Sequence, residues 1–401
     1  MDLRSGSPYW LLKSGILHHY PSLQRNTRAD IAVIGCGISG ALAAYRLCQA
    51  GYSVIMLDKR HVAMGSTAAS TSLLQYEIDT PLHELAAKVG LENALTSYRL
   101  CIEAIEGLGK LANSMNDNAG FSYRESFQFA SYRKHVPDLR KELELRQKHR
   151  ISSVEWLDAG DVKKQFGFEA PAGILSADGA EMDAYYFTHE LIRLCREMGA
   201  EVFDNTTVTT LQHHKKGVTL ITEDNARVEC SYLVIACGYE SEKYVPRKIQ
   251  KNHSTYALVS EPVEKQYLWH RNALIWETAV PYTYLRTTPD NRILIGGRDD
   301  DFYNADRRNK AIKMKRKRLE LIFARMFPGI PFKTDYAWAG TFCSTKDGLP
   351  YIGSIPERPR TYFALGFGGN GITFSYLAAD IIAALIKKQQ HEHAAVFSFN
   401  R

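Results

Sequence analysis

The stretch Asp30-Ile31-Ala32-Val33-Ile34-Gly35-Cys36-Gly37-Ile38-Ser39-Gly40 decides the fold, because an apolar run ends there in a turn that holds three glycines. The pattern predicts a buried strand followed by a helix, with the glycine spacing of a dinucleotide-binding turn. Gly35 suits the tight turn, Gly37 lets the backbone approach a pyrophosphate, and Gly40 lets the helix pack closely on the sheet.

A second strand, Ser53 to Leu57, ends at Asp58, eighteen residues after Gly40. An acidic residue at about this distance binds the adenosine ribose in such folds. A carboxylate there disfavours the 2′-phosphate of NADP, so FAD or NAD is expected. A chance glycine turn is the alternative interpretation, and the flanking strand patterns and the spaced acid argue against it.

Composition describes a globular chain of 401 residues, 45% of them hydrophobic, which predicts two domains or one elaborated domain. Its seven cysteines are scattered without a CxxC motif, so we expect no metal site and no disulfide scaffold. A reducing, cytoplasmic location fits this cysteine usage. Residues 1–20 contain neither a signal-peptide pattern nor a membrane span.

The net charge of +6 comes most densely from the run between Arg307 and Arg318. A nucleic-acid patch is one interpretation of this run. No aromatic stacking residue is interleaved, and the run continues into apolar residues at helical spacing, which favours a solvated helix face. Nucleic acid and membrane are therefore not expected as partners.

A loop rich in small and hydroxyl side chains follows Asp58, from Lys59 to Ser72. Its backbone N–H and side-chain O–H groups are suited to reach a phosphate or a flat ring. A flexible linker is the alternative, and the position directly after the ribose acid argues against it.

The end of the chain predicts a second strand-turn-helix, with a strand over Thr361 to Phe367 and an amphipathic helix over Ile372 to Lys388. Between them lies the turn Gly368-Gly369-Asn370-Gly371. A helix N-terminus offers free N–H groups and partial positive charge, which would stabilise the negative charge of a reduced flavin. A turn that merely ends a strand is the alternative.

In Tyr282-Thr283-Tyr284-Leu285-Arg286, the period of two places Tyr282, Tyr284 and Arg286 on one face of a strand. These side chains could line an anion-accepting pocket, or they could form a wet outer face. The residue pattern leaves both interpretations open.

By these motifs the chain resembles the D-amino-acid-oxidase-like family of FAD-dependent oxidoreductases, of the glycine oxidase and sarcosine oxidase type. The resemblance runs from Ala29 to Lys388 and also includes Leu233 to Gly238, Trp338-Ala339-Gly340 and Thr345 to Gly353. It assigns cofactor binding to Gly35, Gly37, Ile38, Ser39, Gly40, Asp58, Lys59, Gly65, Ser66, Thr67, Ser70, Thr71, Ser72, Val208, Ala236, Cys237, Gly238, Gly340, Gly369, Asn370, Gly371 and Ile372.

The resemblance implies an α/β fold: a Rossmann-like three-layer FAD domain with a β-sheet substrate domain inserted in two pieces. The expected FAD domain comprises residues 1–81, 171–241 and 335–401, and the substrate domain residues 82–170 and 242–334. The implied activity is oxidation of the C–N bond of a small amine or amino acid, with hydride transfer to flavin N5. Imine hydrolysis and reoxidation by oxygen or another acceptor follow.

Departures from the family pattern concern the substrate. Phe342 stands where many relatives have an arginine that holds a substrate carboxylate, and Arg286 could replace it. Arg286, Tyr284 and Lys346 are the candidate catalytic residues, the two cations as positive charges near the flavin. No histidine occupies the loop position used for covalent attachment, so non-covalent FAD is expected. A flavin-binding module with little turnover, or amine oxidation on a modified RNA nucleotide, remain the alternative functions.

Overall fold

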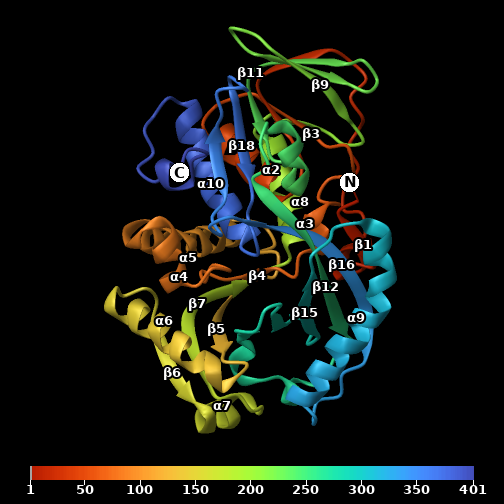
Figure 1. Cartoon of the computed structure of the whole chain (residues 1–401). Coiled ribbons are helices and arrows are strands. Elements are labelled where there is room, and N and C mark those ends of the chain that lie inside the picture. Colours follow the sequence, from red (N-terminus) through yellow and green to blue (C-terminus); the bar gives the residue numbers. More distant parts are fainter. Residues whose placement is uncertain (1) are drawn as a thin grey trace.

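Two β-sheets form the frame of the molecule in a computed structural model that describes residues 2–401 (Figure 1). The eight-stranded sheet is built around a parallel core. Its main path runs β17 (Tyr351–Ser354), β18 (Thr361–Leu365), β11 (Arg227–Ile235), β2 (Thr27–Ile34), β3 (Val54–Leu57) and β8 (Glu201–Phe203), and the hairpin partners β10 (Val218–Thr222) and β9 (Val208–His213) extend from β11.

Strand β2 is the centre of this sheet, and it pairs in parallel with both β3 and β11. Parallel strands need crossover connections, which are supplied here mainly by helices. Helices α2 (Ile38–Gln49), α8 (Ala184–Glu197) and α10 (Gly371–Ile386) pack beside one another as a layer. Ile31 and Val33 of β2 are fully buried under it. The carboxyl ends of the parallel strands therefore meet at a single edge of the sheet.

The ten-stranded sheet is mostly antiparallel and occupies the lower half of Figure 1. Its strands are β1 (Arg4–Gly6), β16 (Thr334–Thr345), β12 (Gln250–Ser260), β15 (Ile293–Asp300), β14 (Thr283–Thr287), β13 (Leu274–Glu277), β5 (Ser122–Phe129), β7 (Ala172–Glu181) and β4 (Leu73–Leu74), with β6 (Val154–Asp158) paired to β7.

Seven more helices surround these sheets. Helix α9 covers the β12 and β16 end of the larger sheet, while α5 packs on both α4 and α10, so it links the two halves. The helices are α1 (Tyr9–Ser14), α3 (Ser66–Ala69), α4 (Leu82–Val89), α5 (Leu91–Asn113), α6 (Val136–Lys148), α7 (Ala159–Phe166) and α9 (Ala305–Met326).

The predicted α/β architecture is confirmed. Four strands that lie wholly or mostly within the residue ranges predicted for the FAD domain, β1, β4, β7 and β16, pair in the ten-stranded sheet. An apolar strand pattern predicts burial without saying which sheet the strand joins, because pairing is set by distant segments. Residues 227–235 form one continuous strand that pairs with β10 at its start and with β18 at its end.

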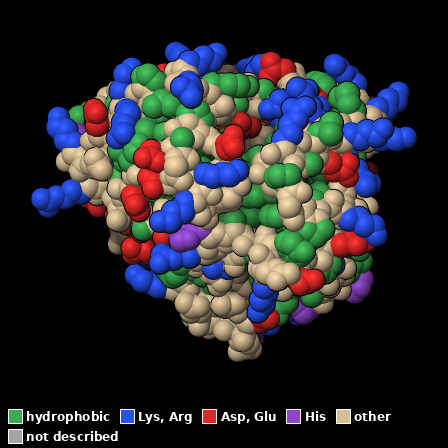
Figure 2. Space-filling model, turned by 90° about the horizontal axis from the view of Figure 1, so that it is seen from below, with side chains coloured by type: hydrophobic (Ala, Val, Ile, Leu, Met, Phe, Trp, Pro, Cys, Tyr) green, Lys and Arg blue, Asp and Glu red, His purple; other side chains and the backbone are tan. Residues whose placement is uncertain are grey.

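Helix α9 holds the basic run, and two of its cations point inward. Lys315 Nζ donates to Asp300 Oδ1 and to the Arg298 carbonyl, each at 2.6 Å. Arg308 is fully buried and donates to Thr341 Oγ1 at 2.6 Å. On the face shown in Figure 2, Lys and Arg side chains stand with Asp and Glu side chains between them. The predicted solvated helix face therefore does not include Arg308 and Lys315, whose side chains are buried.

None of the helices within residues 2–401 combines the length and the apolar character that crossing a bilayer requires.

Gly40→Ala tests the close packing of α2 against the turn after β2. A Cβ atom at Gly40 would lie 1.7 Å from the Gly35 carbonyl oxygen, so the helix must shift to accept it. We expect the substitution to lower the free energy of unfolding by about 3 kcal/mol or more, measured by urea denaturation. Gly329→Ala is the control, since its Cβ would meet nothing within 4 Å. Equal midpoints for the two variants would contradict the packing argument.

Candidate functional site

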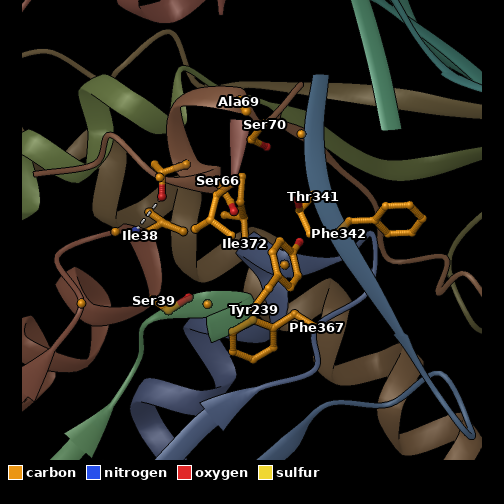
Figure 3. Close-up of a pocket in the computed structure, with 18 of the residues that line it drawn as sticks. Ile38, Ser39, Ser66, Ala69, Ser70, Tyr239, Thr341, Phe342, Phe367 and Ile372 are labelled. Atoms are coloured by element: carbon orange, nitrogen blue, oxygen red, sulfur yellow. Dashed lines mark hydrogen bonds between the residues drawn. The ribbon is translucent and has the colours of Figure 1, made fainter. Parts of the chain in front are cut away.

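One elongated cavity lies where the carboxyl edge of the parallel strands faces the ten-stranded sheet. This edge is where open α/β sheets bind ligands. The cavity begins at residues that directly follow β2, β3, β11 and β18, and it is closed from the other sheet by β12, β14, β15 and β16. Its walls therefore come from segments that lie far apart in the sequence, as the close-up in Figure 3 shows for ten labelled residues.

The turn after β2 brings bare backbone to the cavity. Gly35 has φ +108°, and a Cβ there would lie 2.5 Å from the Ala236 carbonyl oxygen. The turn leads directly into α2, whose first N–H groups have no intrahelical partner. Ile38 N–H donates to Thr67 Oγ1 at 3.0 Å, the dashed line in Figure 3. The hydroxyl-rich loop is thus attached to the N-terminus of α2.

Asp58 lies at the end of β3, where the ribose acid is predicted. Its Oδ2 accepts the Cys36 N–H at 2.7 Å, and its Oδ1 accepts the Arg60 N–H at 2.9 Å. Burial raises the pKa of Asp58, and these hydrogen bonds oppose the rise. Each oxygen keeps a second lone pair for a ligand hydroxyl.

Lys59 and Arg60 beside Asp58 both contact Glu240. Lys59 Nζ lies 2.7 Å from Glu240 Oε1, and Arg60 Nη1 lies 2.9 Å from Glu240 Oε2. Burial acts to raise the pKa of Glu240, but hydrogen bonds from Arg60 and Lys59 lower it to about 2. This end of the cavity therefore carries a charged, hydrogen-bonded cluster with two cations.

The hydroxyl-rich loop 65–72 lines the middle of the cavity, and side chains from other elements donate hydrogen bonds to its backbone carbonyls. Trp10 Nε1 donates to the Ser70 carbonyl at 2.7 Å, and Trp338 Nε1 donates to the Ala69 carbonyl at 2.9 Å. Arg286 Nη1 donates to the Ser72 carbonyl at 2.9 Å. Three side chains from other elements thus fix the backbone, so the loop is not a flexible linker.

The second glycine turn reaches the same cavity from the end of β18. Asn370 Nδ2 donates to the carbonyls of Gln75 at 2.9 Å and Glu77 at 2.8 Å, and Gly369 N–H donates to Asp79 Oδ2 at 2.7 Å. Ser66, Tyr239 and Ile372 surround the centre of the view in Figure 3. The two strand-turn-helix units predicted from the sequence therefore converge.

Of the predicted cofactor residues, Gly40 is the one that lies outside the lining, because it packs against Gly35. The residues that line the cavity are Gly35, Gly37, Ile38, Ser39, Asp58, Lys59, Gly65, Ser66, Thr67, Ser70, Thr71, Ser72, Val208, Ala236, Cys237, Gly238, Gly340, Gly369, Asn370, Gly371 and Ile372.

The structure corrects the interpretation of Arg286 as a carboxylate partner. Tyr282 and Tyr284 do line the cavity, but Arg286 is fully buried beyond it. Its Nε lies 3.2 Å from Glu181 Oε2, and its Nη1 donates to the carbonyls of Thr71, Ser72 and Met182. Arg286 lies on the strand face predicted from the period of two. It is covered by the loop that contains Thr71 and Ser72, which comes from a distant part of the sequence.

Lys346 is also corrected as a candidate catalytic residue. It is solvent-exposed in the bend after β16 and does not line the cavity. Its neighbour Thr345 turns the chain there, because its Oγ1 accepts the Gly348 N–H and donates to the Leu349 carbonyl. Cys343 is a buried thiol whose pKa burial raises to about 12.

Sequence reasoning missed the segment Gln75-Tyr76-Glu77-Ile78-Asp79. Gln75, Glu77 and Asp79 line the cavity, while Tyr76 and Ile78 are buried in the core. The strict alternation of polar and apolar residues is the signal that could have found it.

The end of the cavity beside the ten-stranded sheet is acidic and aromatic. Asp79 and Asp299 line it together with the rings of Trp276, Tyr282 and Tyr284. Burial raises the pKa of Asp299 to about 7, and its Oδ1 is buried without a hydrogen-bond partner. Burial also raises the pKa of Asp79.

Arg286→Ala tests the structural role of the guanidinium. Removing it takes away one of two cations that contact the buried Glu181 carboxylate, the other being Arg124 at 2.8 Å from Oε1, and it releases the carbonyls of the 70–72 loop. We expect the free energy of unfolding to fall by about 3 kcal/mol in urea denaturation. Arg271→Ala is the matched control, because that arginine is 70% exposed and should change stability by about 0.5 kcal/mol or less. A wild-type unfolding curve for Arg286→Ala would refute the assignment.

Asp299→Asn tests the raised pKa. An unfolded aspartate titrates near its ordinary pKa of about 4, whereas the folded group titrates near 7, so the native state binds the proton more tightly. Its favourable contribution is complete below pH 4 and is lost as pH rises through 7. The stability of the variant relative to wild type should therefore rise by about 1–2 kcal/mol between pH 5 and pH 8. A pH-independent difference would place the carboxylate in water.

Comparison with known proteins gives concordant matches over nearly the whole chain. The profile of the family described as FAD dependent oxidoreductase (DAO) matches residues 30–385. Glycine oxidase of Bacillus licheniformis is 26% identical and covers 90% of this chain and 93% of its own, and gamma-glutamylputrescine oxidoreductase of Escherichia coli (strain K12) is 22% identical, covering 95% and 89%.

Among solved structures, glycine oxidase from Geobacillus kaustophilus superposes with a TM-score of 0.77 at 19% identity, over 93% of this chain and 99% of that one. This similarity confirms the predicted fold. Since the family profile spans most of the sequence, the chain belongs to the DAO family of FAD-dependent oxidoreductases, and FAD is its cofactor.

Proposed function

We propose that the cavity binds FAD without a covalent link and that the protein oxidises a C–N bond of a small amine or amino acid. The observation that carries this proposal is the convergence of two glycine turns, from the two ends of the sequence, on one cavity. One turn suits a diphosphate and the other suits a ring that gains negative charge.

The residues after β2 and β3 fit the adenosine and diphosphate portions. A Cβ at Gly37 would come within 3.0 Å of Thr67 Oγ1, so a side chain here would compete with a ligand held near the N-terminus of α2. Asp58 offers lone pairs for the ribose hydroxyls, and the loop 65–72 offers hydroxyl and backbone donors to the phosphates. Val208 and Lys59 complete this end.

The residues after β18 fit the flavin ring. The N-terminal N–H groups of α10 face the cavity at Gly371 and Ile372, where partial positive charge would favour the reduced anion. The side-chain amide of Asn370 donates hydrogen bonds to the carbonyls of Gln75 and Glu77, so this residue positions the turn.

Bound FAD would supply the oxidising chemistry, namely acceptance of a hydride from the carbon next to the substrate nitrogen, with the imine hydrolysed by water and both electrons passed to oxygen or another acceptor. The protein orients the substrate and excludes water. Tyr282 and Tyr284, whose ring centroids lie 5.8 Å apart, form one wall, and Trp276 contributes to the same end. Thr255, Tyr282, Tyr284 and Asp299 come from the ten-stranded sheet, which therefore serves as the substrate side.

The named activities of the relatives support a substrate with an oxidisable amine. The names glycine oxidase and gamma-glutamylputrescine oxidoreductase both refer to the oxidation of a compound that contains an amine. Within residues 2–401, the lysine and arginine side chains that line the cavity are Lys59, Arg60 and Lys243, and none of them occupies the position of Phe342. The ring centroid of Phe342 lies 5.2 Å from that of His253.

Anaerobic titration with a panel of amines and amino acids tests the proposal. We expect the FAD-saturated protein to lose its absorbance near 450 nm with at least one of them and to recover it when an acceptor is added. Gly37→Val should weaken FAD binding by about 100-fold or more, measured by flavin fluorescence with circular dichroism as a control for folding. Full flavin retention by that variant would contradict the site, and a flavin that no amine reduces would favour the binding-module alternative.

A further inference from the structure

Two carboxylates and three aromatic rings share the substrate end of the cavity. Tyr282 Oη donates to Asp79 Oδ1 at 3.3 Å, and the Tyr282 carbonyl accepts the N–H of Arg298, the residue before Asp299. Asp79 is exposed to the cavity, and its charge acts on Asp299 by raising the pKa of that group after the larger effect of burial. The two acids therefore face one shared space beside Tyr282.

The protein does not fully satisfy the Asp299 carboxyl group. Its Oδ1 is buried without a hydrogen-bond partner in the described residues, and a hydrogen bond from the Thr255 side chain lowers the pKa of the group against the larger effect of burial. Because Oδ1 is buried, a ligand in the cavity acts on Asp299 through its charge, and a cation there reduces the cost of burying the carboxylate.

The cations of the described chain do not neutralise this end. The basic residues that line the cavity are Lys243 and the pair Lys59 and Arg60, whose cations contact Glu240. Lys315 acts on Asp299 electrostatically, but its Nζ is bonded to Asp300 and to a carbonyl. Arg298 turns away and donates to the Pro281 carbonyl at 3.1 Å.

We infer that the substrate is an aliphatic diamine without a carboxylate, one of whose ammonium groups is bound by Asp79 and Asp299 among Trp276, Tyr282 and Tyr284. This inference rests on the proposed function and specifies its substrate class. An ammonium group places a positive charge beside the two acids, and that charge is also stabilised by the faces of the aromatic rings. A carboxylate in the same place would meet two like charges with no cation to offset them.

Ligand binding to the reduced enzyme separates recognition from turnover. FAD-loaded protein reduced with dithionite under anaerobic conditions cannot oxidise an amine, so calorimetry reports binding alone. We compare 1,4-diaminobutane with butylamine, 4-aminobutanoate and ornithine, which remove the second ammonium group, replace it with a carboxylate, or add a carboxylate. The diamine should bind about tenfold tighter than butylamine and about 100-fold tighter than 4-aminobutanoate.

Asp299→Asn should reduce the preference for diamine over butylamine to about onefold, whereas Asp301→Asn should retain it. Asp301 is the matched control because its side chain is 77% exposed and lies outside the cavity lining. Asp79→Asn, which keeps an oxygen for the Gly369 N–H, gives a second test if Asp299→Asn does not fold. An unchanged preference in both cavity variants would overturn the inference, as would equal or tighter binding of ornithine.

The outcomes also distinguish this inference from the proposed function. Flavin reduction by an amino acid and not by the diamine would reject the substrate class and leave C–N oxidation intact. Selective diamine binding that is lost in Asp299→Asn, without flavin reduction by any amine, would keep the ammonium site and reject the proposed oxidation.

Discussion

The hydrogen bonds between the second glycine turn and the segment Gln75 to Asp79 hold the two halves of the molecule in register. Asn370 bonds two carbonyls of that segment, and Gly369 bonds the Asp79 carboxylate. The segment follows β4 of the ten-stranded sheet, whereas the turn follows β18 of the eight-stranded sheet. Together with helix α5, which packs on both α10 and β7, this contact sets the separation between the parallel edge and the substrate side.

Buried arginines support the cavity from behind its walls. Arg286 bonds the carbonyls of the 70–72 loop, and Arg308 bonds Thr341 beside the lining residue Gly340. A guanidinium has five donors in a rigid arrangement, so it can satisfy several carbonyls of irregular backbone at once. Such backbone lacks the ladder partners of a sheet, and its polar groups must still be paired when buried. These cations therefore position the site through its loops.

The parts of the site that could be predicted are those whose signal is local. The spacing of Gly35, Gly37 and Gly40 is contained in a few residues, and each position has a steric reason that the structure reproduces. The placement of Arg286 could not be predicted, because the strand period sets its face while residues 71, 72 and 182 decide what covers it. The same limit explains why the sequence pattern does not show that β7 and β16 pair in the ten-stranded sheet.

Asp299 shows the limit for acidic residues. It stands in a run of three aspartates, which in isolation indicates a solvated strand end. In the structure the three separate: Asp300 pairs with Lys315, Asp301 is exposed, and Asp299 lines the cavity. The alternation of side chains along β15 does not predict these three environments, because they depend on α9 and on the segment that contains Asp79.

The cavity is electrostatically polarised along its length, and this polarity constrains what can bind where. Lys59, Arg60 and the N-terminus of α2 face the end that suits a diphosphate, so an anionic cofactor is stabilised there. Asp79 and Asp299 face the other end, where an anion would be repelled and a cation attracted. Because the two sets of charges lie in different parts of the cavity, they favour an anionic cofactor in one part and disfavour an anion in the other.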